Sequence, residues 1–207
     1  PMRFHYLDWG IKGLPPVVFL HGGGLNAHTW DIVCAALRRE RHCVAVDQRG
    51  HGESEWSPEM DYATESHAGD VGAFVDALKL ERFVLVGMSL GGVNGLAWAG
   101  QNSQRLAGLV VVDVGPEIRT EGVRKIAAFT SEATPLDSVE QYVERALSFN
   151  PRRNRELLRR SLLHNLRRMP DGRYMWKYDQ RHRGRAPDPE AYARRRDLLW
   201  SAVDGVK

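Results

Sequence analysis

The chain has 207 residues, of which 43% are hydrophobic and 27% are charged, and its formal net charge is +3. This length and hydrophobic content can support one α/β domain with an insertion, or two small domains. No run of about 18 apolar residues occurs, so the composition excludes a transmembrane helix and predicts no membrane partner.

The charge is unevenly distributed along the chain. Residues 1–116 carry 9 Lys and Arg against 13 Asp and Glu, whereas residues 117–207 carry 20 against 13. The basic residues of the second half alternate with acidic residues and with apolar residues at helical spacing, and no nucleic-acid motif accompanies them. We therefore expect solvated, arginine-rich helices and no nucleic-acid partner. A basic lid that attracts anionic substrates is the alternative.

Strand and helix patterns alternate through the first half. The expected strands are residues 4–8, 17–20, 43–46, 83–86 and 106–112, and the expected helices are residues 29–39, 65–78 and 93–101, the first capped by Thr29 or Asp31. Continuously apolar strands separated by helices predict a mostly parallel sheet with helices on both faces. The carboxyl ends of such strands meet at one edge, where open α/β sheets place their sites.

The most specific motif is Gly87-Met88-Ser89-Leu90-Gly91, between an expected strand and an expected helix. In this context Gly-x-Ser-x-Gly indicates a nucleophile, because the sharp turn lifts the serine hydroxyl out of the sheet edge. Glycine is needed at the first and last positions because a side chain there would clash with the neighbouring strand and helix. A glycine-rich turn with an incidental serine is the alternative.

Pro116 ends the alternation of strands and helices. Helices are expected at residues 123–130, 138–149, 152–166 and 189–200, with a turn at 169–173. A helical insertion after a sheet strand predicts a lid. The apolar residues that either line an acyl pocket or pack the lid onto the core are Phe129, Tyr142, Leu147, Phe149, Trp176 and Trp200. We divide the chain into a core (1–116), a helical lid (117–200) and a segment (201–207) that approaches another strand.

Three further motifs accompany the serine turn, two before it in the sequence and one after it. They are His21-Gly22-Gly23-Gly24, the segment Asp-Gln-Arg-Gly-His-Gly-Glu-Ser at 47–54, and Val-Asp-Val-Gly-Pro at 112–116. In this order and spacing, the chain resembles the α/β-hydrolase superfamily, in its compact single-domain branch with a helical lid. The resemblance covers residues 3–116 closely and the lid loosely.

The resemblance implies a role for each motif. Ser89 would be the nucleophile, and the Leu90 amide would form an oxyanion hole with the amide of Gly23 or Gly24. Asp113 ends the strand after the serine strand, so it could be the triad acid, an auxiliary acid or a residue that anchors the lid. Met88, beside the nucleophile, and Trp176, in the lid, are our candidate substrate contacts.

Several histidines are present, but none matches the family's catalytic position. The resemblance makes His21 and His51 structural residues of their loops. The catalytic histidine of this family lies after the last sheet strand, and neither His164 nor His182 fits that motif. We therefore expect the last strands and helices, with the catalytic base, to lie outside these 207 residues. A serine without a base is a poor nucleophile, so we expect the chain as given to lack full activity.

The leading functional hypothesis is a serine hydrolase that cleaves a small carboxylic ester or related acyl compound through an acyl-enzyme at Ser89. Dehalogenase and epoxide-hydrolase members use Asp at that position, so esterases, lactonases, thioesterases, perhydrolases and carbon–carbon bond hydrolases stay open. A non-hydrolytic ligand- or partner-binding protein on the same scaffold is the alternative.

The remaining signals favour a cytoplasmic protein without a cofactor. The N-terminal residues lack a signal-peptide pattern, and Cys34 and Cys43 are expected to be reduced, buried and inert. No metal-ligand spacing and no nucleotide-binding loop is visible in the sequence. We therefore expect no metal and no cofactor.

Overall fold

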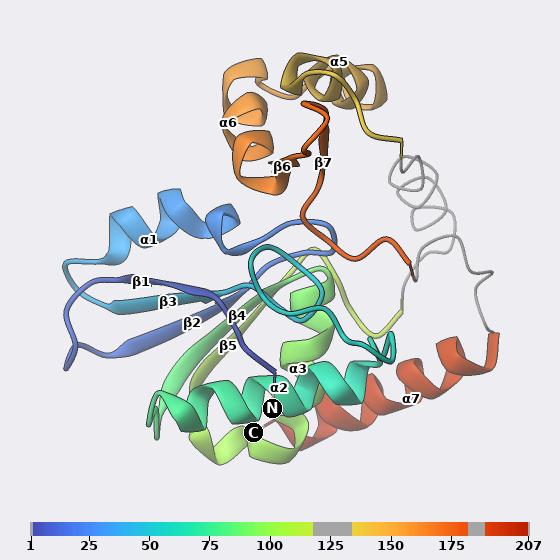
Figure 1. The fold of residues 1–207 in the computed structure, drawn as a ribbon. Helices are drawn as coiled ribbons and strands as arrows, with labels where there is room; N and C mark the ends of the chain where they lie inside the picture. The colour runs from blue at the N-terminus through green and yellow to red at the C-terminus, as the bar shows by residue number, and fades with distance from the viewer. Residues whose placement is uncertain (1, 118–133, 182–188, 207) are drawn as a thin grey trace.

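The computed structural model describes residues 2–117, 134–181 and 189–206. Its centre is a five-stranded sheet in the order β1-β3-β2-β4-β5 (Figure 1). The strands are β1 (Tyr6–Trp9), β2 (Pro16–Leu20), β3 (His42–Val46), β4 (Phe83–Met88) and β5 (Leu106–Val112). β2 to β5 run parallel and β1 runs antiparallel to β3. The predicted mostly parallel sheet is confirmed.

Both faces of the sheet are covered, which explains its continuously apolar strands. In β2, Val18 and Leu20 pack with α2 (Thr64–Ala77) and with Trp98 of α3 (Leu90–Asn102). Val17 and Phe19 point to the other face, where they pack with η1 (Ala27–Trp30) and α1 (Asp31–Leu37). A short 3-10 helix, η2 (Ser103–Arg105), joins α3 to β5.

The helix expected at 29–39 begins earlier, at Ala27, and its first turn is a 3-10 helix instead of an α-helix. Its first turn is η1, whose N-cap Asn26 accepts a hydrogen bond from the His28 amide at 3.1 Å. Asp31 is the first residue of α1, and neither Thr29 nor Asp31 provides the cap. Asn at an N-cap is as favourable as Asp or Ser, so the sequence pattern did not distinguish among these polar residues.

A second group of elements lies beyond the carboxyl ends of the parallel strands (Figure 1). This α5–β7 unit comprises α5 (Val139–Phe149), α6 (Arg155–Asn165) and the two-stranded sheet of β6 (Leu166–Arg168) and β7 (Tyr174–Trp176). It has its own core, in which Tyr142 and Val143 pack against Leu158 and Leu162. The two helices and the turn at 169–173 appear where the sequence predicted them. The three-residue strands were not predicted, because they are too short to show a periodicity.

Helix α7 (Pro189–Gly205) packs against α3 and so covers the sheet, not the α5–β7 unit (Figure 1). Its buried residues Leu199 and Ala202 contact Val93 and Leu96 of α3. The helix continues through Ser201 to Gly205, because apolar residues three apart continue one helical stripe. That this segment leads back towards another strand of the core stays a prediction.

The helix expected at 123–130, with Phe129, lies outside the described residues, as does His182. Within the described part of the chain, no helix is both long enough and apolar enough to cross a bilayer.

Candidate active site

Four polar residues mark one edge of the sheet. His21, Asp47, Ser89 and Asp113 each directly follow one of the parallel strands β2, β3, β4 and β5. Because these strands are parallel and in register, their carboxyl ends gather at the same edge. The sequence motifs that were predicted separately therefore meet there.

Ser89 occupies a strained turn between β4 and α3. Its φ is +50° and its ψ is −113°, a conformation that non-glycine residues rarely adopt. The turn is held by hydrogen bonds from the Ser89 amide to the Val112 carbonyl at 2.9 Å and from the Gly91 amide to the His21 carbonyl at 3.1 Å. A Cβ atom at Gly87 would overlap the Gly91 carbonyl, and one at Gly91 would overlap the Leu20 carbonyl. Glycine is required at both positions, as the sequence indicated.

The glycine loop after β2 lies beside this turn. A Cβ atom at Gly22 would stand 3.6 Å from Ser89 Cβ and 3.2 Å from Met88 Cε, and one at Gly23 would stand 3.8 Å from Leu90 Cβ. Gly23 is exposed, whereas Gly24 is buried and has a φ of +77°. Leu90 is the first residue of α3, and an amide at that position has no acceptor within its helix. The exposed Gly23 thus lies beside Leu90, the residue whose amide has no acceptor within its helix.

His21 is fully buried, and both of its ring nitrogens form hydrogen bonds. The Gln48 amide donates to its Nε2 at 2.9 Å, so Nδ1 carries the proton and donates to the Gly22 carbonyl at 2.8 Å. Burial lowers the pKa of His21 to about 4, only partly offset by the hydrogen bond to the Gly22 carbonyl. Gln48 also donates to the His21 carbonyl at 2.6 Å and accepts from Asn94 Nδ2 at 2.7 Å. With both ring nitrogens occupied, His21 holds the glycine loop in place and is not free to act as a base.

Asp47 organises the loop after β3. Its buried carboxylate accepts hydrogen bonds from the Ala27 amide at 2.6 Å, from the Glu53 amide at 2.9 Å and from His5 Nδ1 at 2.8 Å. Its own carbonyl accepts from the Ser54 hydroxyl at 2.6 Å. Asp47 therefore joins the 47–54 turn to the first residue of η1, close to the glycine loop.

The histidine of this turn, His51, is also structural. It is buried, its Nδ1 lies 2.9 Å from the Arg49 carbonyl, and its backbone forms a bridge with Tyr178. The Arg49 side chain reaches α2, where its Nη2 donates to Asp70 Oδ1 at 2.7 Å. Both residues hold the loop, and for His51 this agrees with the structural role that the resemblance implied.

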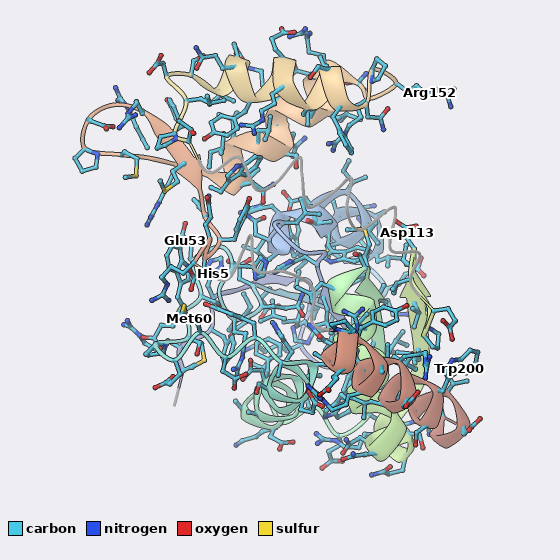
Figure 2. All side chains as sticks on the ribbon, turned by 90° about the vertical axis from the view of Figure 1, so that its right-hand side faces the viewer. His5, Glu53, Met60, Asp113, Arg152 and Trp200 are labelled. Atoms are coloured by element: carbon cyan, nitrogen blue, oxygen red, sulfur yellow. The ribbon has the colours of Figure 1, made fainter. Side chains whose placement is uncertain are left out.

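Asp113 is exposed and has a φ of +57°. Figure 2 shows it at the end of β5, on the side of the α5–β7 unit. It directly follows Val112, whose carbonyl accepts the Ser89 amide. Asp113 is thus the next residue after one that is hydrogen-bonded to Ser89, and no hydrogen bond joins the Asp113 and Ser89 side chains among the described residues.

No histidine is paired with the Ser89 hydroxyl within residues 2–117, 134–181 and 189–206. His164 lies in the last turn of α6 and stacks on His28, with ring centroids 3.7 Å apart. That His164 does not occupy the family's catalytic position stays a prediction.

The two predicted substrate contacts have different surroundings. Met88 is half-buried and lies against Gly22, next to Ser89. Trp176 is half-buried in the α5–β7 unit, where its ring meets Tyr142 edge-on at 5.0 Å and stacks near Tyr178 at 5.7 Å. Met88 therefore lies at the site, whereas the ring contacts of the half-buried Trp176 are with Tyr142 and Tyr178.

Sequence reasoning missed the polar side chains that support this edge. Gln48 and Asn94 are buried amides that join the His21 loop to α3, and Asn26 Nδ2 donates to the His164 carbonyl at 2.8 Å. Isolated buried amides leave no periodic signal. Only Asn26, a cap residue just after the glycine loop, belonged to a recognisable pattern.

Comparison with known proteins agrees with this architecture. The sequence pattern of the alpha/beta hydrolase fold family matches residues 15–187. The esterase Rv0045c of Mycobacterium tuberculosis is 34% identical over 180 residues, which cover 84% of this chain and 59% of the esterase. Haloalkane dehalogenase 2 of Mycobacterium bovis is 35% identical over 109 residues, which cover 53% of this chain and 37% of the dehalogenase.

A solved structure of the same M. tuberculosis esterase, from work on its transition metal inhibition, superimposes with a TM-score of 0.78 at 31% identity. The alignment covers 98% of this chain and 68% of that structure. The chain thus spans less than two thirds of the length of these curated relatives.

Proposed function

We propose, since this chain belongs to the α/β-hydrolase fold family, that it is a serine hydrolase whose Ser89 forms an acyl-enzyme with a small carboxylic ester. The observation that carries the proposal is the strained φ of +50° at Ser89, in a turn that lies against the glycine loop. Strain of about 1–3 kcal/mol persists only where the surroundings enforce it, and it concentrates at functional sites.

In the proposed reaction, the Ser89 oxygen attacks the ester carbonyl carbon while its proton passes to a base. The Leu90 and Gly23 amides stabilise the resulting oxyanion. Removing one such donor typically lowers kcat by about 10²- to 10³-fold. The alcohol then leaves with a proton, and water cleaves the acyl-enzyme to release the acid and restore Ser89. Exposure favours Gly23 over the buried Gly24 as the second donor.

An ester fits better than a haloalkane as the substrate. The esterase relative aligns over 84% of the chain, against 53% for the dehalogenase. The resemblance places Asp at the nucleophile position of dehalogenases, and this chain has Ser89. Lactonase, perhydrolase and carbon–carbon hydrolase activities use the same serine and are alternatives within the proposal. The α5–β7 unit would serve as the lid, Met88 and Trp176 as substrate contacts, and Asp113 as an acid of the site.

Fluorophosphonate labelling of the full-length protein, followed by peptide mass spectrometry, tests the proposal. We expect one adduct on Ser89, and its loss in Ser89→Ala. The same substitution should lower kcat/KM for p-nitrophenyl esters of short acids by at least about 10³-fold. Ser103→Ala, in η2 at the other end of α3, is the matched control and should label and turn over as the wild type does.

If the full-length protein carries no Ser89 adduct, and if Ser89→Ala hydrolyses esters as fast as an active wild type, the proposal is wrong and another nucleophile does the work. If neither the wild type nor Ser89→Ala hydrolyses esters above the uncatalysed rate, the proposal is also wrong, and that result would favour the non-hydrolytic binding protein.

A further inference from the structure

Three titratable side chains from distant parts of the chain meet where α6 lies near η1. His28 belongs to η1, Asp31 is the first residue of α1, and His164 lies in the last turn of α6. One ligand atom from each of the three lies within 4.8 Å of the other two. None of these residues has a role in the proposed hydrolysis.

We propose that His28, Asp31 and His164 form a binding site for a divalent transition-metal ion such as Zn²⁺, which ties α6 to η1. Two imidazole nitrogens and one carboxylate oxygen are a donor set that suits Zn²⁺, Cu²⁺ and Ni²⁺. Ca²⁺ and Mg²⁺ prefer oxygen ligands. The site is independent of Ser89.

The distances suit a metal after a small adjustment. His28 Nδ1 lies 3.0 and 3.2 Å from the two Asp31 carboxylate oxygens. Ligands of a tetrahedral ion with bonds of about 2.0–2.1 Å stand about 3.4 Å apart. The His28 and His164 rings are stacked at 22°, and because a nitrogen lone pair lies in its ring plane, one ring must rotate to face a shared ion. Within the described residues the His164 ring makes no hydrogen bond that would resist this rotation.

The charges around the cluster also bear on the binding of a cation. Asp31 supplies negative charge. Lys177 and Arg160 lie near enough to oppose a cation, but Lys177 is neutralised by Glu53, whose Oε1 lies 2.5 Å from its Nζ. The side chains of His28 and Asp31 are 30% and 14% exposed, which leaves access for water as a further ligand.

The cysteine pair is a weaker competitor for Zn²⁺. Burial, with Cys43 close by, raises the pKa of the Cys34 thiol to about 12. The thiolate is the metal-binding form, so a thiol that stays protonated at neutral pH binds poorly.

The sequence predicted no metal site because only two of the three ligands are close in the chain. His28 and Asp31 are three residues apart, and His164 follows far downstream. Only the approach of α6 to η1, to which the hydrogen bond from Asn26 to the His164 carbonyl contributes, brings the third ligand into place.

Calorimetric titration of full-length protein with Zn²⁺ tests the proposal. We expect one ion per chain, with affinity at least tenfold weaker in His28→Gln and in His164→Gln. The matched control is His42→Gln, because His42 also pairs with a carboxylate, Asp8 Oδ1 at 2.7 Å, yet stacks on no second histidine among the described residues. Its affinity should change less than about twofold. Ser89→Ala should bind Zn²⁺ like the wild type, which separates this test from that of the proposed function.

A measurement on the wild type makes the result independent of how the variants fold. Zn²⁺ should shift the imidazole NMR resonances of His28 and His164 together and leave those of His42 in place. Zn²⁺ should also raise the unfolding temperature, because an ion that binds only the folded state stabilises it. Undiminished Zn²⁺ affinity in His164→Gln, or resonance shifts confined to other histidines, would overturn the proposal.

Discussion

At the scale of single residues, the turn at Ser89 depends on close backbone contacts that only glycine permits. Gly91→Ala would place a methyl group on the Leu20 carbonyl, so we expect it to destabilise the protein by about 1–3 kcal/mol. Urea unfolding would measure the change. Gly69→Ala is the matched control within α2, because its Cβ meets nothing within 4 Å. It should stabilise by up to about 1 kcal/mol, and equal effects of the two substitutions would contradict the argument.

The lowered pKa of His21 leads to a prediction about how the free energy of unfolding depends on pH. Its folded pKa of about 4 lies below the usual 6.5, so between these values the unfolded chain binds a proton that the folded chain does not. Stability should therefore rise with pH from 4 to 6.5, by up to about 1.4 kcal/mol per pH unit from this residue. His21→Gln should flatten the slope measured by urea unfolding at pH 4.5, 5.5 and 6.5. An unchanged slope would show that His21 is not the group responsible.

At the scale of elements, α7 owes its position to a narrow apolar stripe. Leu199 is fully buried against α3, so Leu199→Ala should cost about 2–5 kcal/mol of unfolding free energy. Val203→Ala, on the same helix but 39% exposed, should cost much less. Urea unfolding of both variants checks this, and similar losses would mean that α7 is not held through Leu199.

At the scale of the whole molecule, Asp179 joins the segment after β7 to the loop that precedes α2. The Asp179 amide donates to the Gly50 carbonyl at 2.8 Å, and its buried carboxylate accepts from Tyr62 Oη at 2.6 Å and from Arg181 Nη2 at 2.6 Å. Burial opposes ionisation, but the hydrogen bonds from Arg181 and Tyr62 outweigh it and lower the pKa of Asp179 to about 2.

Because this pKa is depressed, the ionised carboxylate stabilises the fold above pH 4, and that contribution is lost as the pH falls from about 4 to about 2. Asp179→Asn should therefore cost about 2 kcal/mol at pH 7, and the difference from the wild type should shrink at pH 3 in urea unfolding. Asp171→Asn is the control, since Asp171 pairs with Arg173 on the exposed surface. It should change stability far less than Asp179→Asn does at pH 7, because an exposed ion pair contributes little.

The sequence by itself determined three features: the mostly parallel sheet, the alternation of strands and helices along the chain, and the strand, turn and helix around Ser89. These features follow from patterns within a few residues. The patterns are continuous apolar strands, apolar residues at helical spacing, and glycines at positions where the turn has no room for a side chain. The two helices of the α5–β7 unit were predictable for the same reason. Both began at a capping residue, Ser138 and Asn154.

Only the tertiary structure decided the place of α7 and the pairing of the short strands β6 and β7. It also decided which polar residues support the candidate site. Gln48 reaches both His21 and Asn94, and His164 reaches His28, through contacts between residues far apart in the chain. Such contacts leave no periodic pattern in one sequence, because packing and buried hydrogen bonds, rather than local backbone preference, bring those residues together.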